Sequence, residues 1–215
     1  MNALSIESFK EKMKGDVTVL DTRHGDFFSQ GFIPGSIFIG LEGRFSEWSG
    51  SLLSFTKPIL LVTEKDKAAD AINNLTKVGF AAIEGYLEGG FDTWKNAGEK
   101  MDMIIDVEAD ELAMDIPHDP NLQVIDVRRE TEFADGHVKS AINLPLNEMT
   151  DLALIADFEE HQNLYIHCGG GYRSLIACSI LKSHGIHNLR NVLGGWDKIK
   201  EQPTIKINKE PSVLN

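Results

Sequence analysis

Residues 163–174 read NLYIHCGGGYRS, an apolar run that ends in a cysteine, followed by three glycines, a tyrosine, an arginine and a serine. The short apolar run up to His167, bounded by a glycine cluster, predicts a buried strand. The segment that follows, SLIACSILKSHG, has apolar residues in a pattern compatible with a well-buried helix, with Gly185 as its C-cap. We therefore expect a strand, a glycine loop and a helix, with Cys168 at the lip of the loop.

The chain repeats itself with a constant offset of 105 positions. Four segments return in the same order: VLDTR (19–23) as VIDVR (124–128), GFIPGSIFI (31–39) as GHVKSAINL (136–144), LLVT (60–63) as YIHC (165–168), and LEGGFDTW (87–94) as VLGGWDKI (192–199). A period of this length is typical of a duplicated domain rather than a solenoid repeat. We expect one domain over residues 1–100 and a second over residues 101–215, with a boundary in the polar stretch KNAGEKMDM.

Short apolar runs alternate with helical patterns inside each copy. In the second copy, QVID, SAIN, LYIH and RNVL are predicted strands. Alternation of strands and helices without a tight hairpin signal indicates an α/β fold, with a mainly parallel sheet covered by helices on both faces. Ligands bind such sheets at the carboxyl ends of the strands, which is where Cys168 falls.

The loop after the strand is suited to holding an anion. Gly169, Gly170 and Gly171 can adopt backbone angles closed to other residues and turn their amides inward, next to the positive end of the following helix. The helix end and Arg173 both favour the thiolate form of Cys168. A cation is mildly unfavourable at a helix start, and the thiolate with its substrate is the anion expected to offset it. The alternative is that Cys168 is a small core residue, which is the role expected of Cys178.

These motifs together resemble the rhodanese (sulfurtransferase) family. C-G-G-G-Y-R-S follows an apolar strand, with VIDVR, EF, GHV and SAIN before it and LGGW after it. The resemblance implies that Cys168 is the nucleophile and carries a sulfane sulfur as a persulfide. It also implies that Gly169, Gly170, Gly171, Tyr172 and Arg173 bind the substrate, with Arg173 orienting an anionic donor. Lys139-Ser140 replaces the Pro-Gly usual in the family, a variation expected to leave the chemistry unchanged.

Other polar residues in these motifs are expected to serve structure. Asp126, Arg128 and Glu132 are predicted to form a carboxylate–guanidinium network at a strand end, and His137 a hydrogen bond in a turn. The scattered histidines do not form a metal motif, and GGGYRS lacks the G-x-G-x-x-G order of a dinucleotide site. We expect neither a metal nor a cofactor.

The first copy lacks the residues of the loop. Thr63 stands at the position of Cys168, and Glu64-Lys65-Asp66 replace the three glycines. We expect this copy to be inactive in sulfur transfer and to serve by packing, shaping the cleft or holding a partner. An inactive copy before an active one resembles the rhodanese repeats of bacterial proteins fused to a metallo-β-lactamase-fold persulfide dioxygenase. The H-x-H-x-D-H motif of that domain is absent, so a stand-alone protein and a part of a larger fusion both stay open, with a dioxygenase as a candidate partner.

The composition of the chain indicates which partners and which cellular compartment are expected. The chain has 33 acidic and 21 basic residues and a formal net charge of −12, which disfavours nucleic acid and anionic membranes as partners. Only two cysteines are present, and the first fifteen residues lack the apolar stretch of a signal peptide. These features favour a reducing cytoplasm.

The leading hypothesis is transfer of sulfur from thiosulfate or a low-molecular-weight persulfide to a thiol, sulfite or cyanide through a persulfide on Cys168. A phosphatase or arsenate reductase of the same fold is one alternative. Such enzymes have a loop that resembles C-x5-R, with five residues between the cysteine and the arginine. Only four residues lie between Cys168 and Arg173. A non-catalytic interaction module is the other alternative.

Overall fold

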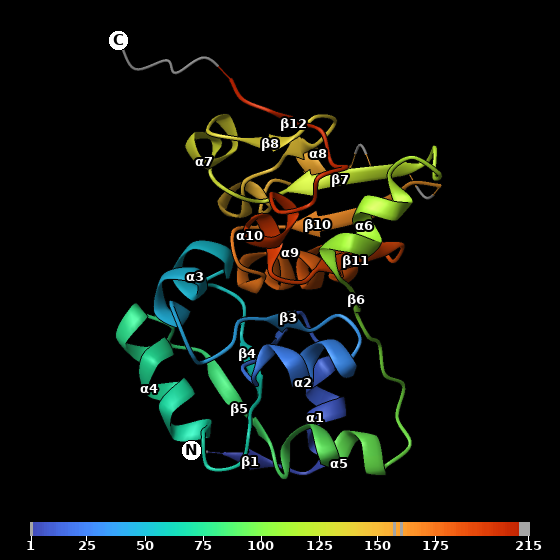
Figure 1. Ribbon diagram of the computed structural model, residues 1–215. Helices are drawn as coiled ribbons and strands as arrows, with labels where there is room; N and C mark the ends of the chain where they lie inside the picture. Colours follow the sequence, from blue (N-terminus) through green and yellow to red (C-terminus); the bar gives the residue numbers. More distant parts are fainter. Residues whose placement is uncertain (1, 157, 160, 211–215) are drawn as a thin grey trace. The chain divides into compact units, whose positions relative to one another are not determined.

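The computed structural model describes residues 2–156, 158–159 and 161–210. It divides into two compact units, Met1–Met103 and Ile104–Asn215, here called the first and second domains. Met1 and residues 211–215, the outer ends of the expected domains, lie outside the described residues. Each domain contains a five-stranded parallel sheet with helices packed on it (Figure 1).

The first domain has the strand order β1-β5-β4-β2-β3. Its strands are β1 (Ala3–Leu4), β2 (Thr18–Asp21), β3 (Ile37–Phe38), β4 (Ile59–Val62) and β5 (Ile83–Leu87). Its helices are α1 (Ile6–Met13), α2 (Gly25–Gln30), α3 (Phe45–Leu52), α4 (Ala68–Val78) and α5 (Gly90–Asn96).

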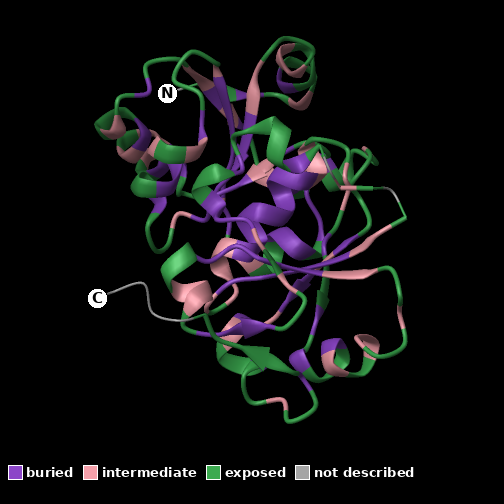
Figure 2. Cartoon of the chain, turned by 90° about the horizontal axis from the view of Figure 1, so that it is seen from above, coloured by how far each residue is buried: buried purple, intermediate pink, exposed green. Residues whose placement is uncertain are grey.

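The first domain buries both faces of its sheet. All four residues of the central strand β4 are buried, as expected for a strand covered on both sides (Figure 2). Phe9 of α1 and Trp94 of α5 pack with Leu60 and Val62 in one core cluster. Helices α3 and α4 contact each other, and α4 ends at Val78, followed by the C-cap Gly79, whose φ of 114° is a left-handed conformation that favours glycine.

The second domain has the strand order β6-β11-β10-β7-β9 and an additional antiparallel pair, β8 with β12. Its strands are β6 (Ile105–Val107), β7 (Leu122–Asp126), β8 (His137–Val138), β9 (Ile142–Asn143), β10 (Asn163–His167), β11 (Leu189–Val192) and β12 (Ile207–Asn208). Its helices are α6 (Ala109–Asp115), α7 (Glu130–Ala134), the 3-10 turn η1 (Leu146–Glu148), α8 (Leu152–Ile155), α9 (Tyr172–Ser183) and α10 (Gly195–Ile199).

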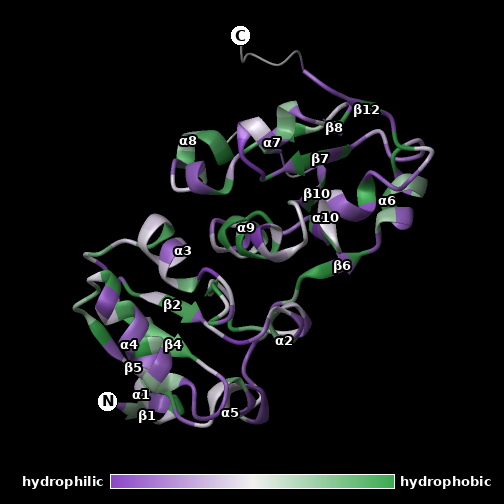
Figure 3. Ribbon diagram, turned by 60° about the vertical axis from the view of Figure 1, so that its left-hand side comes forward, coloured by the Kyte–Doolittle hydropathy of each residue, from purple (hydrophilic) through white to green (hydrophobic). Residues whose placement is uncertain are grey.

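The two sheets share one topology, and the pairs β2–β4 and β7–β10 share one register. Asp21 pairs with Val62 in the first sheet, and Asp126 pairs with His167, the corresponding residue, in the second. Helix α9 is buried at every position from 174 to 181, and it forms an apolar core element of the second domain (Figures 2 and 3). The expected α/β fold, two tandem domains with helices on a mainly parallel sheet, is confirmed.

Candidate functional site

Cys168 lies directly after β10, the middle strand of the second sheet, and is 1% exposed. Its Sγ accepts a hydrogen bond from the amide of Gly171 at 3.1 Å. The sulfur is therefore held at the carboxyl end of a central parallel strand by a backbone donor, as expected for an anion-binding loop.

The three glycines of the loop differ in what they contribute. Gly171 has φ of +104°, which side-chain-bearing residues rarely adopt. A Cβ at Gly169 would lie 3.1 Å from the Arg173 guanidinium, whereas a Cβ at Gly170 would meet nothing within 4 Å. Of the three glycines, only Gly171 has a positive φ, so the conformational freedom expected of all three is used at Gly171.

The loop is anchored at the start of α9. Gly171 is the N-cap of this helix and makes no side-chain capping bond. The hydroxyl of Ser174 lies 2.8 Å from the Gly171 carbonyl and 2.6 Å from Oδ1 of Asn191, and the Asn191 amide donates to Asp106. The amide of the N-cap residue Gly171 thus lies beside Cys168, with Tyr172 as the opening residue of the helix.

Arg173 does not stand free for a ligand. Its guanidinium donates to both carboxylate oxygens of Glu132 on α7, at 2.7 and 2.8 Å. These hydrogen bonds lower the pKa of Glu132 to about 2 and raise that of Arg173. The carboxylate of Glu132 is the main anion beside this cation, and the Cys168 sulfur expected there contributes as well, since it also raises the pKa of Arg173.

The expected network at the end of β7 is confirmed for two of its three members. Arg128 donates to both oxygens of the fully buried Asp126, at 2.6 to 3.0 Å, and to the Gly136 carbonyl. Its guanidinium also lies 4.5 Å from the ring centre of Trp196. Glu132, the third predicted member, pairs with Arg173 instead.

Three further residues of the second domain, two histidines and the second cysteine, are held by hydrogen bonds or by burial. Nδ1 of His137 lies 2.9 Å from the Phe133 carbonyl, which confirms the predicted turn hydrogen bond. Burial lowers the pKa of His167, and its Nε2 is the one buried side-chain nitrogen or oxygen of the described residues without a hydrogen-bond partner. Cys178 is fully buried on α9, as predicted, and burial raises the pKa of its thiol.

The corresponding loop of the first domain lacks the thiol, but the buried arginine–aspartate pair and its aromatic contact, here called the frame, are present. Arg23 pairs with buried Asp21 and lies 4.2 Å from the Phe91 ring centre, as Arg128 does with Asp126 and Trp196. This repetition shows that the buried ion pair belongs to the fold. An open pocket of about 1050 Å³ lies at the carboxyl end of this sheet. Phe27 and Ala68 line it and occupy the positions that Glu132 and Arg173 have in the second domain.

The part of the chain that the structure describes has no group of three or more His, Cys, Asp or Glu side chains that could hold a metal ion. Its helices include none long and apolar enough to cross a membrane. The chemistry that the second-domain site itself offers is nucleophilic: one thiol, backbone amides suited to an anion, and an arginine–glutamate pair at the rim.

The model of the rhodanese-like domain matches residues 5–97 and 108–202, which together are most of the chain. The chain therefore belongs to the rhodanese-like domain family. A Drosophila melanogaster relative, "Rhodanese domain-containing protein CG4456", is 34% identical over 101 residues, 41% of this chain and 90% of that protein. An Allochromatium vinosum relative named "Sulfurtransferase" is 24% identical over 93 residues, 43% of this chain and 85% of that protein.

Other relatives are matched over a smaller share of their length. A Bacillus subtilis protein is 26% identical over 101 residues, and the match covers 54% of that protein. Among solved structures, a thiosulfate sulfurtransferase from Pseudomonas aeruginosa is similar with a TM-score of 0.42 and 17% identity. That match covers 98% of this chain and 44% of the Pseudomonas chain.

Proposed function

We propose that the chain is a sulfurtransferase that carries a sulfane sulfur on Cys168. The observation that carries the proposal is the position of this thiol, at the end of a central strand with the Gly171 amide on its Sγ. Membership of the rhodanese-like family and the relative named as a sulfurtransferase support it. The first domain supports it by contrast, since the same frame there holds Thr63 instead of a thiol.

The proposed reaction has two half-reactions. The Cys168 thiolate forms a bond to the outer sulfur of thiosulfate, the sulfur–sulfur bond of thiosulfate breaks, and sulfite leaves with the electron pair. With a low-molecular-weight persulfide as donor, the leaving group is a thiolate. A thiol, sulfite or cyanide acceptor then attacks the terminal sulfur of the Cys168 persulfide and restores the thiolate, which gives ping-pong kinetics.

The loop residues have distinct proposed roles. Gly169, Gly170, Gly171 and Tyr172 present the amides that hold the charged persulfide. Arg173 acts at the rim of the loop in a pair with Glu132, where it contributes to orienting an anionic donor. Residues 101–215 form the catalytic domain in this proposal, and residues 1–100 form a domain without sulfur-transfer activity.

The proposal also covers the partners. Small anionic sulfur donors and thiol, sulfite or cyanide acceptors are the substrates that the site chemistry suits. The tandem order of an inactive and an active domain supports a persulfide dioxygenase as the protein that supplies or receives this sulfur, in the cytoplasm.

Intact-mass measurement tests the proposal. Incubation with thiosulfate or glutathione persulfide should add one sulfur atom to the protein, and cyanide should remove it. Cys168→Ser should abolish the gain, whereas Cys178→Ser should retain it, because Cys178 is fully buried in α9. A wild-type protein that never gains sulfur, or a Cys168→Ser variant that still does, refutes the proposal. Turnover with thiosulfate, glutathione persulfide and 3-mercaptopyruvate then ranks the donors.

A further inference from the structure

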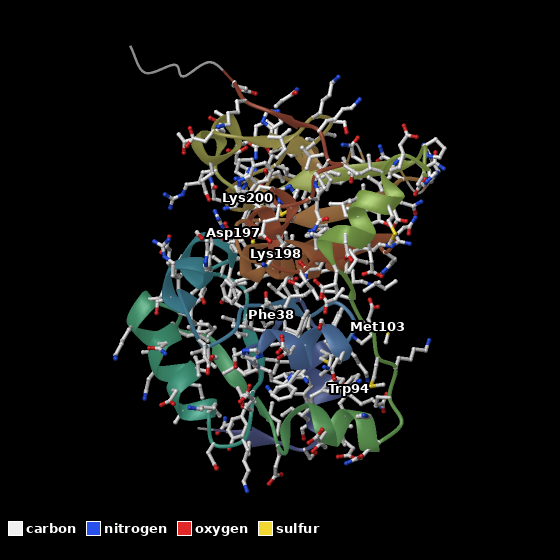
Figure 4. All side chains as sticks on the ribbon, viewed as in Figure 1. Phe38, Trp94, Met103, Asp197, Lys198 and Lys200 are labelled. Atoms are coloured by element: carbon white, nitrogen blue, oxygen red, sulfur yellow. The ribbon has the colours of Figure 1, made fainter. Side chains whose placement is uncertain are left out.

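The start of α10 is in direct backbone contact with the Cys168 loop. The amide of Trp196 donates to the Cys168 carbonyl at 2.6 Å, and the amide of Asp197 donates to the Gly169 carbonyl at 3.1 Å. Figure 4 labels Asp197 together with Lys198, which follows it on the same short helix, and Lys200, the C-cap of that helix. Residues 194–197 are called the glycine turn below.

Gly195 makes this approach possible. Its φ of +53° lies in the left-handed region. A Cβ at this position would lie 2.4 Å from the Cys168 carbonyl oxygen and 2.9 Å from the Gly169 carbonyl oxygen. Any side chain here would therefore push both loop carbonyls out of place.

The direction of these two carbonyls determines where the loop amides point. In a planar trans peptide, the C=O and the N–H of the same unit point in opposite directions. The carbonyls of Cys168 and Gly169 are held toward α10 by hydrogen bonds, so the amides of Gly169 and Gly170 are turned away from α10. The glycine turn thereby sets the orientation of the donors available to an anionic sulfur.

The first domain shows which part of this arrangement the fold itself requires. Gly90 corresponds to Gly195, has φ of +64°, and a Cβ there would lie 2.6 Å from the Thr63 carbonyl oxygen. However, within the described residues neither the Phe91 amide nor the Asp92 amide donates to the carbonyl of Thr63 or Glu64. The close approach is common to both domains, whereas the two hydrogen bonds accompany the cysteine loop.

We propose that the glycine turn is a positioning element for sulfur transfer, in which Gly195 and the amides of Trp196 and Asp197 hold the Cys168 loop in its anion-binding orientation. The effect on sulfur transfer rests on the proposed function, whereas the effect on the loop does not. These residues are positioning residues, since they act on the sulfur through the loop backbone.

The matched variants are Gly195→Ala and Gly90→Ala in the full-length chain. Both introduce a methyl group at a positive φ and against a strand-end carbonyl, so both carry a comparable cost in stability. The readouts are the rate of iodoacetamide alkylation of Cys168 as a function of pH, and the rate of sulfur loading from thiosulfate. For Gly195→Ala we expect alkylation at neutral pH about tenfold slower, because the amides of Gly169 and Gly170 lose the orientation in which they can donate to a charged sulfur.

Gly90→Ala should leave both rates within about twofold of wild type, since this residue belongs to the domain without the thiol and contacts Thr63 instead of the Cys168 loop. In sulfur transfer, Gly195→Ala should lower kcat more than it raises KM. Equal effects of the two variants on alkylation would overturn the positioning role, even if the wild type loads sulfur. A wild type that loads no sulfur overturns the proposed function instead, and the alkylation comparison then still decides whether the turn positions the thiol.

A measurement on the unmodified protein covers the case in which Gly195→Ala does not fold. Hydrogen exchange should be about tenfold slower at the amides of Trp196 and Asp197 than at those of Phe91 and Asp92, which lack these acceptors. Exchange at equal rates in the two pairs would contradict the proposal.

Discussion

The guanidinium of Arg173 and the carboxylate of Glu132 form two hydrogen bonds, at 2.7 and 2.8 Å, although the residues lie 41 positions apart in the sequence. The pair connects the first turn of α9 to α7 at the rim of the Cys168 loop. In the first domain, Phe27 and Ala68 occupy the same two positions beside a loop without a thiol. The pair therefore accompanies the cysteine and is not required by the frame of the domain.

This relationship predicts coupled effects on sulfur loading. Glu132→Gln and Arg173→Ala should each lower the loading rate from thiosulfate about tenfold, because each releases the partner from its fixed position. The double variant should lose much less than the product of the two single effects, since residues in one ion pair act as a unit. Rates are measured by intact mass in single-turnover experiments. Single effects that multiply in the double variant would show that the residues act independently.

The same pair predicts a pH window for stability. Hydrogen bonds from Arg173 lower the pKa of Glu132 to about 2, below its ordinary value. A carboxyl group with a lowered folded-state pKa stabilises the fold above its unfolded-state value, and this contribution is lost as the pH falls through the folded-state value. The difference in unfolding free energy between wild type and Glu132→Gln should therefore be constant above about pH 5 and shrink between about pH 5 and 2.

Urea unfolding at successive pH values, with thiosulfate absent, measures this difference. Its size is expected to be small, because half-exposed ion pairs are screened by solvent. A difference that grows as the pH falls, or that changes near pH 6 to 7, would show that another group is titrating.

Much of the fold follows from the sequence, for physical reasons. The offset between VLDTR and VIDVR equals the offset between LLVT and YIHC. Both copies therefore have the same buried strands in the same order, which predicts the same topology for both domains. Apolar runs such as Ile59–Val62 are fully buried strands and are recognisable by their continuous hydrophobicity. The short pair β8 and β12 was not predicted, since two-residue strands carry no periodic signal.

The site could be predicted only in part. A cysteine between an apolar strand and a glycine cluster identifies the loop locally. The partner of Arg173 depends on tertiary structure, because Glu132 is one of several acidic residues that a sequence pattern cannot rank by distance. The close approach of the glycine turn to the Cys168 loop is not predicted either, although LGGW is one of the quoted motifs. The repeated glycine pair in LEGGF and VLGGW is the signal that could have indicated a close backbone approach in both copies.

A cysteine placed at the corresponding position of the first domain should not take up sulfur. In Thr63→Cys combined with Cys168→Ser, the introduced thiol lies beside Glu64 and Asp66 and lacks the glycine loop. We expect alkylation no faster than that of an ordinary thiol, and no sulfur gain from thiosulfate, because like charge disfavours a thiolate. Intact mass and alkylation rates measure both properties. Sulfur loading by this variant would show that the frame alone suffices.

One substitution in the first domain should stabilise it. Asp66 has φ of +64° and is the one non-glycine residue with a positive φ among those that the structure describes. It corresponds to Gly171 of the second domain, where φ is +104°. Asp66→Gly should raise the free energy of unfolding by about 0.5 to 1 kcal/mol, as strain is relieved in a position that suits glycine.

Thermal and urea unfolding of the full chain check the Asp66→Gly effect. Gly171→Asp is the reverse substitution in the second domain and should destabilise it. A decrease in stability for Asp66→Gly would indicate that the aspartate side chain makes a favourable local interaction that outweighs the backbone strain.

The contact between the glycine turn and the Cys168 loop has an optical consequence. Trp196 is the one tryptophan of residues 104–215, its amide holds the Cys168 carbonyl, and its ring lies against Arg128. Indole emission depends on local electric fields, and a charged sulfur on Cys168 alters the field at this ring. The second domain thus contains an intrinsic fluorophore beside the Cys168 thiol, and we expect the emission of this fluorophore to change when the thiol takes up sulfur.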